Sequence, residues 1–317
     1  MTGRSNQQTT PTQYEIRNTL VLGSRTSALA MWQSRHVMAA LQAAWPGLEC
    51  TIEPFITQGD KTLDRPLPEI GGKGLFTLEL ENGLREGRID LAVHSLKDLP
   101  VDDAPGLILG AILGRADVRD VLVAKSGRSL DELPAGAVVG TSSLRRQAQL
   151  LALHPELIVR SIRGNVETRI QKALHGEHDA TLLAGAGVTR LGLDAQISQW
   201  LPLEVMLPAP GQGALAVQCR ADDERTLELL AAIHNDEVAQ AVTAERAFLA
   251  GLGGGCSIPV GAYATVNDGT IHLIGLVAAV DGSRIIRVEG SGTAPLELGV
   301  SLADAAKSQG ALALINT

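Results

Sequence analysis

The stretch IDLAVHS (residues 89–95), which runs directly into Leu96-Lys97-Asp98, decides the fold of the first third of the chain. It is a short apolar run bounded by polar residues, which is typical of a buried strand. Upstream of it, residues 20–23 and 51–57 also suit strands, and residues 26–44 and 75–85 suit amphipathic helices. Strands that alternate with helices predict a mainly parallel sheet covered by helices.

The middle third of the chain repeats this alternation. Strands are predicted at 121–124, 137–139, 157–162 and 180–184, and helices at 144–153 and 165–174. Thr141-Ser-Ser143 and Asn165 supply the side chains that cap helix N-termini. The sequence therefore predicts a second α/β unit.

The last third changes character after residues 201–215, LPLEVMLPAPGQGAL, whose three prolines and two glycines are typical of a linker. Residues 214–219 suit a strand that returns to the first sheet. Two helices (223–233 and 236–250) precede three strands (258–266, 270–280 and 284–289), and Asn267-Asp-Gly269 and Asp281-Gly282 between these strands are hairpin signals. A final helical pattern covers 296–315, so this part predicts a smaller α+β domain with an antiparallel three-stranded sheet.

These patterns divide the chain into a tail and three domains. The expected bounds are 1–17 for a disordered tail, 18–113 with 214–231 for domain 1, 114–213 for domain 2, and 232–317 for domain 3.

Composition excludes several classes of protein. A net charge of −8 argues against broad attraction to nucleic acid, which needs a surplus of Lys and Arg. The three cysteines are far apart in sequence and form neither a disulfide framework nor a metal or redox motif, and His175 and His178 are too isolated for a metal site. The first 17 residues lack the apolar core of a secretory signal, and no run of about 18 apolar residues predicts a membrane span. We therefore expect a cytoplasmic protein.

Basic side chains recur where predicted strands give way to helices. In open α/β sheets these strand ends form the ligand crevice, and arginine recognises carboxylate or phosphate with two parallel hydrogen bonds. A single arginine is more often solvated or paired with one of the 35 acidic residues, but the set as a whole indicates a ligand with several negative groups. The helix dipole disfavours cations in a first turn, so Arg145 and Arg146 need a further reason for their position. The set comprises Arg25, Lys97, Arg145, Arg146, Arg163, Arg169 and Arg190.

Asp98 and Cys256 are the residues best suited to chemistry. Asp98 follows a strand beside Lys97, where a carboxylate can accept a ligand N–H and stabilise a developing cation, although a surface Lys-Asp pair is an equal alternative. Cys256 lies in GLGGGCSIPVG (251–261), which fails the dinucleotide-loop pattern and suits a turn where the backbone approaches another group closely. Its sulfur could be a nucleophile or an attachment point, and the pattern does not choose between them. His94 suits a structural histidine.

A series of motifs in one order identifies a family. They are LGSRTSALAMWQ (22–33), TQGD (57–60), GGKGLF (71–76), DLAVHSLKDLP (90–100), GTSSLRRQAQL (140–150), IRGNVETR (162–169), LPAPGQGALAVQCR (207–220) and GGCSIPVGAYA (254–264). From about residue 20 to the C-terminus the chain resembles the porphobilinogen deaminase family. This resemblance implies two α/β domains like the lobes of type II periplasmic binding proteins, followed by the smaller α+β domain.

The resemblance also implies a reaction. Four porphobilinogen molecules are joined head to tail with loss of ammonia, and the linear tetrapyrrole is released by hydrolysis. A dipyrromethane cofactor primes the chain through a thioether to a cysteine that matches Cys256. Asp98 matches the catalytic aspartate, which hydrogen-bonds pyrrole N–H groups, assists the departure of ammonia and stabilises the azafulvenium cation.

Further positions match the family's binding residues. Lys73 and Phe76 match its mobile loop near the cleft, and Gly253 departs from the polar or acidic residue that is frequent there. The residues implied to bind the cofactor are Lys97, Asp98, Ser143, Arg145, Arg146, Arg169 and Cys256. Those implied to bind substrate are Arg25, Ser27, Gln33, Arg163 and Arg190.

Two other functions stay open on sequence grounds. Two α/β lobes with arginines at strand ends also suit a non-enzymatic protein that binds small anions. Alternatively, Cys256 could be a catalytic nucleophile with His94 as its base. The chain shows no heptad pattern, so we expect a monomer. From the net charge, the lack of a long apolar run and the isolated histidines we expect no nucleic-acid, membrane or metal partner.

Overall fold

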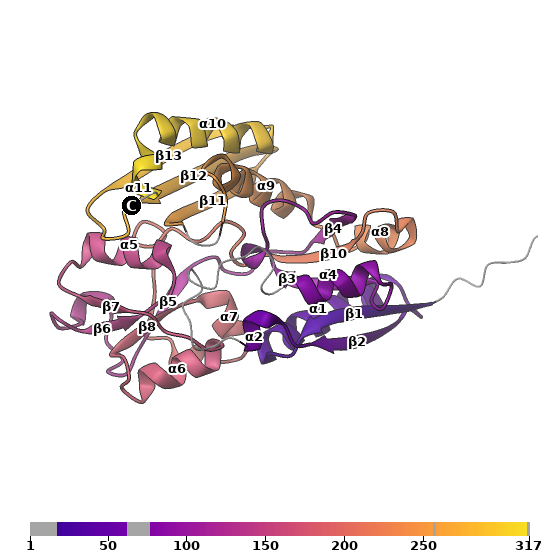
Figure 1. The fold of residues 1–317 in the computed structure, drawn as a ribbon, viewed down its shortest axis with the longest axis horizontal. Coiled ribbons are helices and arrows are strands. Elements are labelled where there is room, and N and C mark those ends of the chain that lie inside the picture. The colour runs from indigo at the N-terminus through magenta and orange to yellow at the C-terminus, as the bar shows by residue number, and fades with distance from the viewer. Residues whose placement is uncertain (1–17, 62–76, 256–257, 316–317) are drawn as a thin grey trace, which may run out of the picture.

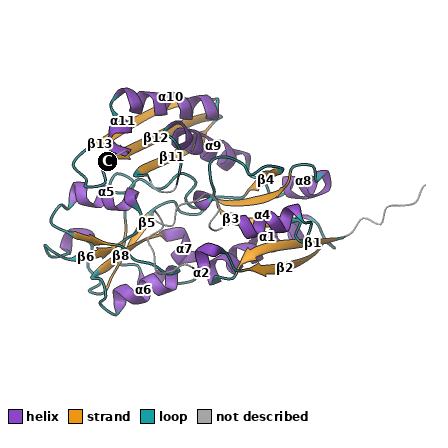
Figure 2. Ribbon diagram, in the orientation of Figure 1, coloured by secondary structure: helices purple, strands orange, loops and turns teal. Residues whose placement is uncertain are grey.

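The computed structural model describes residues 18–61, 77–255 and 258–315. These residues form two five-stranded sheets and one three-stranded antiparallel sheet (Figures 1 and 2), which confirms the predicted fold class. The tail 1–17 and the predicted site residues Lys73, Phe76 and Cys256 lie outside the described residues. Within the described part of the chain, no helix is long and apolar enough to cross a membrane.

The first sheet has the order β2-β1-β3-β10-β4. β1 is parallel to both β2 and β3, whereas β10 is antiparallel to both of its neighbours. Four strands therefore run in one direction and β10 runs against them, so the predicted mainly parallel sheet holds for four of five strands. β4 was not predicted. The strands are β1 (Thr19–Arg25), β2 (Glu49–Phe55), β3 (Leu91–Ser95), β4 (Leu107–Ile112) and β10 (Leu215–Arg220).

Helices cover both faces of this sheet because its strands are apolar on both sides. Leu91 and Val93 of β3 pack in one core with α1 (Ala28–Ala44) and α8 (Glu224–Ala231). Ala92, between them in sequence, packs with α4 (Leu78–Arg85) on the other face, as strand alternation requires. A short helix, α2 (Gln58–Lys61), follows β2. We call this unit the first lobe.

The second sheet repeats the arrangement with the order β7-β6-β8-β5-β9. β5 alone is antiparallel to its neighbours, as β10 is in the first sheet. Its strands are β5 (Asp120–Ala124), β6 (Val138–Gly140), β7 (Ile158–Arg160), β8 (Ala180–Ala184) and β9 (Gln199–Trp200). Its helices are α5 (Leu144–Leu153), α6 (Val166–Leu174) and α7 (Gly185–Arg190). We call this unit the second lobe.

Two crossover segments, 113–119 and 206–214, join the lobes and lie side by side. Arg115 Nε donates to the backbone oxygen of Gln212 (3.0 Å), and the Ala116 N–H donates to the oxygen of Gly213 (3.2 Å). A Cβ atom on Gly213 would lie 2.6 Å from the Ala116 oxygen, and its φ of +89° also favours glycine. The predicted linker at 201–215 is therefore largely buried against its counterpart.

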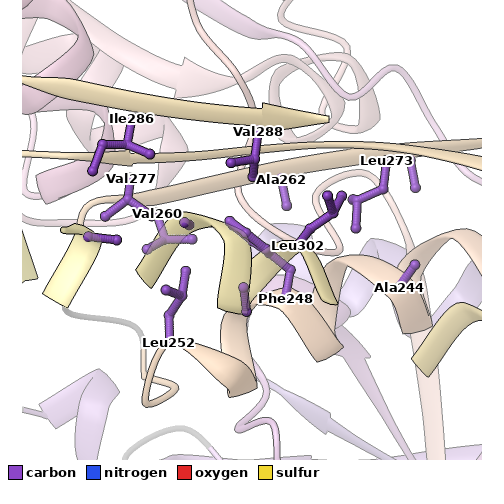
Figure 3. Close-up of a cluster of buried hydrophobic side chains, with 14 of the residues drawn as sticks. Ala244, Phe248, Leu252, Val260, Ala262, Leu273, Val277, Ile286, Val288 and Leu302 are labelled. Atoms are coloured by element: carbon purple, nitrogen blue, oxygen red, sulfur yellow. The ribbon is translucent and has the colours of Figure 1, made fainter. Parts of the chain in front are cut away.

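The third sheet packs on two long helices. Phe248 of α9 (Asp236–Gly251) is fully buried between the sheet and Leu302 of α10 (Pro295–Ser308) (Figure 3). Asp268 and Gly269 at the β11–β12 turn have positive φ, as the predicted hairpin requires. The predicted helix 296–315 is interrupted at Gln309-Gly310 and resumes as α11 (Ala311–Ile315). The strands are β11 (Val260–Asn267), β12 (Thr270–Ala278) and β13 (Ile285–Gly292).

Candidate active site

A cavity of about 670 Å³ lies between the two lobes, where strands of both sheets end. Arg25 closes β1, Lys97 and Asp98 follow β3, and Leu183 and Ala184 close β8. The volume is in the range of sites that hold a small organic ligand. The cationic side chains that line it are Arg25, Lys97, Arg146, Arg163, Arg169, Lys172 and Arg190.

Asp98 is the single acidic residue among the described residues that line this cavity. It lies in a short 3₁₀ helix, Leu96–Asp98, directly after β3, and it is exposed. It also lines a second hollow of about 70 Å³ next to Arg25, Thr77 and His94. One carboxylate among many cations therefore lies where both spaces meet, as the strand-end pattern predicts.

Lys97 faces the same cavity and is partly buried. Burial lowers the pKa of Lys97 to about 8, with Arg146 and Arg145 acting in the same direction and Asp98 and Asp120 opposing it. Its Nζ atom donates a hydrogen bond to Oε1 of Gln212 at 3.3 Å. Lys97 is thus largely protonated at neutral pH and loses its charge as the pH rises through about 8.

Arg169 and Arg190 enter the cavity from the second lobe. Arg169 Nε donates to the oxygen of Gly164 (2.8 Å), and Arg190 Nη2 donates to the oxygen of Gly213 (2.7 Å). Arg190 also lies over the ring of Trp32 in α1, 5.7 Å from its centroid. Burial lowers the pKa of each arginine to about 10, so both remain cationic at neutral pH.

A buried carboxylate explains the two arginines in the first turn of α5. Asp120, fully buried at the start of β5, forms ion pairs with Arg145 Nη1 (2.8 Å) and Arg146 Nη2 (2.8 Å). Burial alone would raise the pKa of Asp120, but the two guanidinium groups hold it well below its usual value. The carboxylate outweighs the unfavourable helix dipole, which falls off within one turn.

The two arginines differ in what else they reach. Arg146 lines the cavity and also donates to the oxygen of Leu182 (3.1 Å). Arg145 does not line the cavity, and its Nη1 also donates to the oxygen of Leu207 (2.6 Å). Ser143 does not line it either, and its hydroxyl caps α5 by accepting from the N–H of Arg146. The contacts predicted for Arg145 and Ser143 with a ligand stay predictions.

The remaining predicted binding residues lie on the cavity wall. Ser27 caps α1 by accepting from the N–H of Ala30 (3.3 Å), and Gln33 donates to Oγ of Ser95 (2.8 Å). Arg25 and Arg163 line the same space. The structure therefore brings together Arg25, Ser27, Gln33, Lys97, Asp98, Arg146, Arg163, Arg169 and Arg190.

Sequence reasoning missed Asp120, Gln212 and Lys172. Lys172 lines the cavity one turn after Arg169 on α6, a spacing that could have suggested it. A charge directly before the apolar run VLVA was the signal for Asp120. Gln212 carried no signal apart from its place in the glycine-rich crossover.

His94 is buried in the wall of the smaller hollow. Burial lowers the pKa of His94 to about 4, and the nearby charge of Arg25 acts in the same direction. Its imidazole is therefore neutral at pH 7 and a weak base, which fits the structural role predicted for it. Among the described residues, no group of three or more His, Cys, Asp or Glu side chains is arranged to hold a metal ion.

Family models match nearly all of the chain. Residues 20–228 match the porphobilinogen deaminase dipyrromethane cofactor-binding domain, and residues 239–308 match the porphobilinogen deaminase C-terminal domain. The chain belongs to the porphobilinogen deaminase family. The first match contains the second lobe, nearly all of the first lobe and every described residue that lines the cavity, and the second contains most of the third domain.

Three solved structures are similar to this family member at low sequence identity. The methionine-binding protein MetQ is 13% identical with a TM-score of 0.44, and the match covers 70% of this chain and 93% of that one. A YaeC-family lipoprotein from Enterococcus faecalis is 14% identical (TM-score 0.42; 70% and 94% covered). An ancestral arginine-binding protein is 16% identical (TM-score 0.39; 68% and 91% covered). The family assignment rests on the family models and not on these similarities.

The cavity of this porphobilinogen deaminase family member fits a ligand such as dipyrromethane. Its wall carries a large excess of cations in a protein whose net charge is −8. Carboxylates of a pyrrole chain can pair with these cations, and pyrrole N–H groups, which are donors only, need an acceptor such as Asp98. The residues present therefore supply both kinds of partner.

Proposed function

We propose that this protein joins four porphobilinogen molecules head to tail, with release of ammonia, and then releases the linear tetrapyrrole hydroxymethylbilane by hydrolysis. The proposal extends the family's role in tetrapyrrole biosynthesis to this chain. A dipyrromethane cofactor bound through a thioether at Cys256 would supply the pyrrole terminus that is extended. Cys256 itself lies outside the described residues.

Asp98 is the residue we assign to the chemistry. When the bond from the aminomethyl carbon to the protonated amine breaks, the nitrogen leaves as ammonia with the bonding electrons, and the positive charge passes to the remaining carbon. An ionised carboxylate close to that carbon stabilises the charge, and it can accept a pyrrole N–H that orients the ring. Asp98 is the only acid among the described lining residues, so no other carboxylate in the described part of the cavity can take this role.

The cations hold the substrate and the growing chain. Each porphobilinogen ring carries two carboxylates, and charge-assisted pairing with arginine is strong and directional. Arg146, Arg169 and Arg190 come from the second lobe, and Lys97 comes from the first. We propose that they fix the rings so that each reacting carbon lies beside Asp98. This combination of one carboxylate with many cations is the observation that carries the proposal.

An intact mass of the purified protein tests the cofactor. We expect the chain mass plus two linked pyrrole units, and we expect the Cys256→Ser variant to have the mass of the bare chain. Cys219 is buried, so the Cys219→Ser variant is a matched control that keeps the addition. Active protein with the bare-chain mass would contradict the thioether.

The Asp98→Asn variant tests the chemistry. It keeps the shape of the side chain and removes its charge, so we expect the fold and the added mass to persist while turnover falls by at least about a hundredfold. Asp103→Asn, an exposed carboxylate on the following loop, is the matched control and should leave turnover unchanged. Wild-type turnover in Asp98→Asn would remove this residue from the mechanism. Binding of porphobilinogen without release of ammonia by the wild type would favour the anion-binding alternative.

We also propose that the protein acts as a monomer in the cytoplasm, with the domain bounds predicted from the sequence. Sedimentation of the purified protein tests the oligomeric state, and a stable dimer would contradict it.

A further inference from the structure

Gln212 lies in the second crossover at the junction of the two lobes and is fully buried. Its backbone N–H donates to the oxygen of Ala209 (2.9 Å), and its backbone oxygen accepts from Arg115 Nε. Both ends of its side-chain amide are also paired. A buried amide with every group paired is rigidly held, because each broken hydrogen bond would leave a polar atom without water.

The orientation of this amide follows from its partners. Nε2 donates to the oxygen of Val118 (2.7 Å) and to Oδ1 of Asp120 (2.9 Å). Both partners are acceptors only, since two arginines keep Asp120 ionised. The nitrogen must face them, so the oxygen Oε1 points the other way, toward Lys97. There it accepts the hydrogen bond from Lys97 Nζ.

Four charged groups act on the Lys97 ammonium group. Asp98 is adjacent in the chain, and Arg145, Arg146 and Asp120 face it from the second lobe. The arginines repel the ammonium group, and a lysine side chain is flexible enough to turn away from them. The Gln212 oxygen is a neutral acceptor that offsets this repulsion on the side of the second lobe.

We propose that Gln212 is a positioning residue that holds the Lys97 ammonium group on the cavity wall and joins it to the Asp120 cluster. In this arrangement one crossover amide sets the spacing between a cation of the first lobe and the arginines of the second. The consequence for substrate binding rests on the function proposed above, whereas the position and charge of Lys97 do not.

The titration of Lys97 tests this directly in the full chain. The sequence contains only six lysines, so ¹³C-dimethylation of the intact protein gives a tractable NMR spectrum, and Lys97→Arg identifies its signal. Gln212→Met keeps the side-chain length and removes the acceptor. We expect the titration midpoint of Lys97 to fall below its wild-type value of about 8. The expected loss of proton affinity is roughly tenfold, because the charged form loses the hydrogen bond to Gln212.

A second variant should move the titration midpoint of Lys97 in the opposite direction. Gln212→Glu places a carboxylate beside Lys97, so we expect its midpoint to rise above 8. If Gln212 only filled space, the two substitutions would change the titration midpoint of Lys97 in the same direction or not at all. Opposite shifts therefore support the proposal, and equal midpoints in wild type, Gln212→Met and Gln212→Glu would overturn it.

Gln149 provides a matched control. It is also buried and fully paired, but its side chain bonds to backbone groups of Leu207 and Arg145 and does not reach Lys97. Gln149→Met should lower thermal stability much as Gln212→Met does, while the Lys97 midpoint stays at its wild-type value. A shift of Lys97 in Gln149→Met as large as in Gln212→Met would show a general packing effect and overturn the proposal.

Steady-state kinetics then tests whether the position of the Lys97 ammonium group affects the proposed reaction. We expect Gln212→Met to raise KM for porphobilinogen about tenfold with little change in kcat, because Asp98 is untouched and a carboxylate-binding cation is displaced. If wild type makes no product, the proposed function fails while the titration shifts still decide the role of Gln212. Normal KM together with an unshifted Lys97 midpoint would refute the positioning role.

Discussion

The two lobes share one topology but differ at the first residue of their reversed strand. Leu215 begins β10 and pairs with Ser95 at the end of β3, and Asp120 begins β5 and pairs with Ala184 at the end of β8. The two positions are therefore equivalent. Leu215 packs in the apolar core of the first lobe, whereas Asp120 is equally buried and binds two arginines.

This difference shows how one scaffold gives two kinds of cavity wall. In the first lobe the core beneath the cavity is apolar, and the functional residues Lys97 and Asp98 come from the end of a strand. In the second lobe a buried carboxylate allows two arginines in a first helical turn, and one of them, Arg146, reaches the cavity. The buried carboxylate on the reversed strand of the second lobe thus accounts for one cation of the wall, Arg146.

Asp120→Leu makes the second lobe resemble the first and should have the largest effect. The substitution leaves two buried guanidinium groups without their carboxylate, which costs on the order of 3–5 kcal/mol in the free energy of unfolding. Urea denaturation followed by circular dichroism measures this loss. The exposed pair of Asp117 and Arg119 is the matched control, and Asp117→Leu should cost about 1 kcal/mol or less. Equal losses in the two variants would mean that Asp120 is not an anchor.

Arg145→Met and Arg146→Met separate the contribution of these arginines to the stability of the second lobe from their contribution to ligand binding. Each removes one ion pair with Asp120, so we expect similar losses of stability. Only Arg146 lines the cavity, so only its removal should weaken binding of a dicarboxylate such as glutarate. A lost charge-assisted hydrogen bond is worth about 1.5–3 kcal/mol, or roughly ten- to a hundredfold in Kd, which calorimetry can measure. An equal loss of affinity in Arg145→Met would give both arginines a binding role.

Sequence reasoning predicted much of the fold because the signals were local. Apolar runs, caps such as Asn165 and the hairpin at Asn267-Asp-Gly269 each depend on a few neighbouring residues. The reversed direction of β5 and the existence of β4 and β9 did not follow from local pattern. They depend on which strands meet after the chain crosses between lobes, and sequence periodicity does not contain that information.

Sequence reasoning could also predict which residues lie at strand ends near the candidate site, but not the contacts that depend on packing. Strand ends gather at one edge of a sheet, so Arg25 and Asp98 of the first lobe could be expected to lie together. The division between Arg145 and Arg146 could not, because neighbouring residues on a helix point about 100° apart and only the packed structure shows which one faces the cavity. The contacts of Gln212 could not be predicted either, since they join three segments that are far apart in the sequence.

The smallest expected effect is a pH dependence that belongs to the first lobe alone. Lys97 has a pKa lowered to about 8, so it is charged below that pH and neutral above it, whereas Arg169 and Arg190 have pKa values of about 10 and stay charged. An anionic ligand favours the charged form, so affinity should decrease as the pH rises through 8. Between pH 7 and 9 we expect Kd for glutarate to rise by up to about tenfold, since the loss of one charge per binding event gives at most a tenfold change per pH unit above the pKa. Lys97→Arg keeps its charge throughout, so its affinity should stay nearly flat; an equal decrease in that variant would place the titrating group elsewhere on the cavity wall.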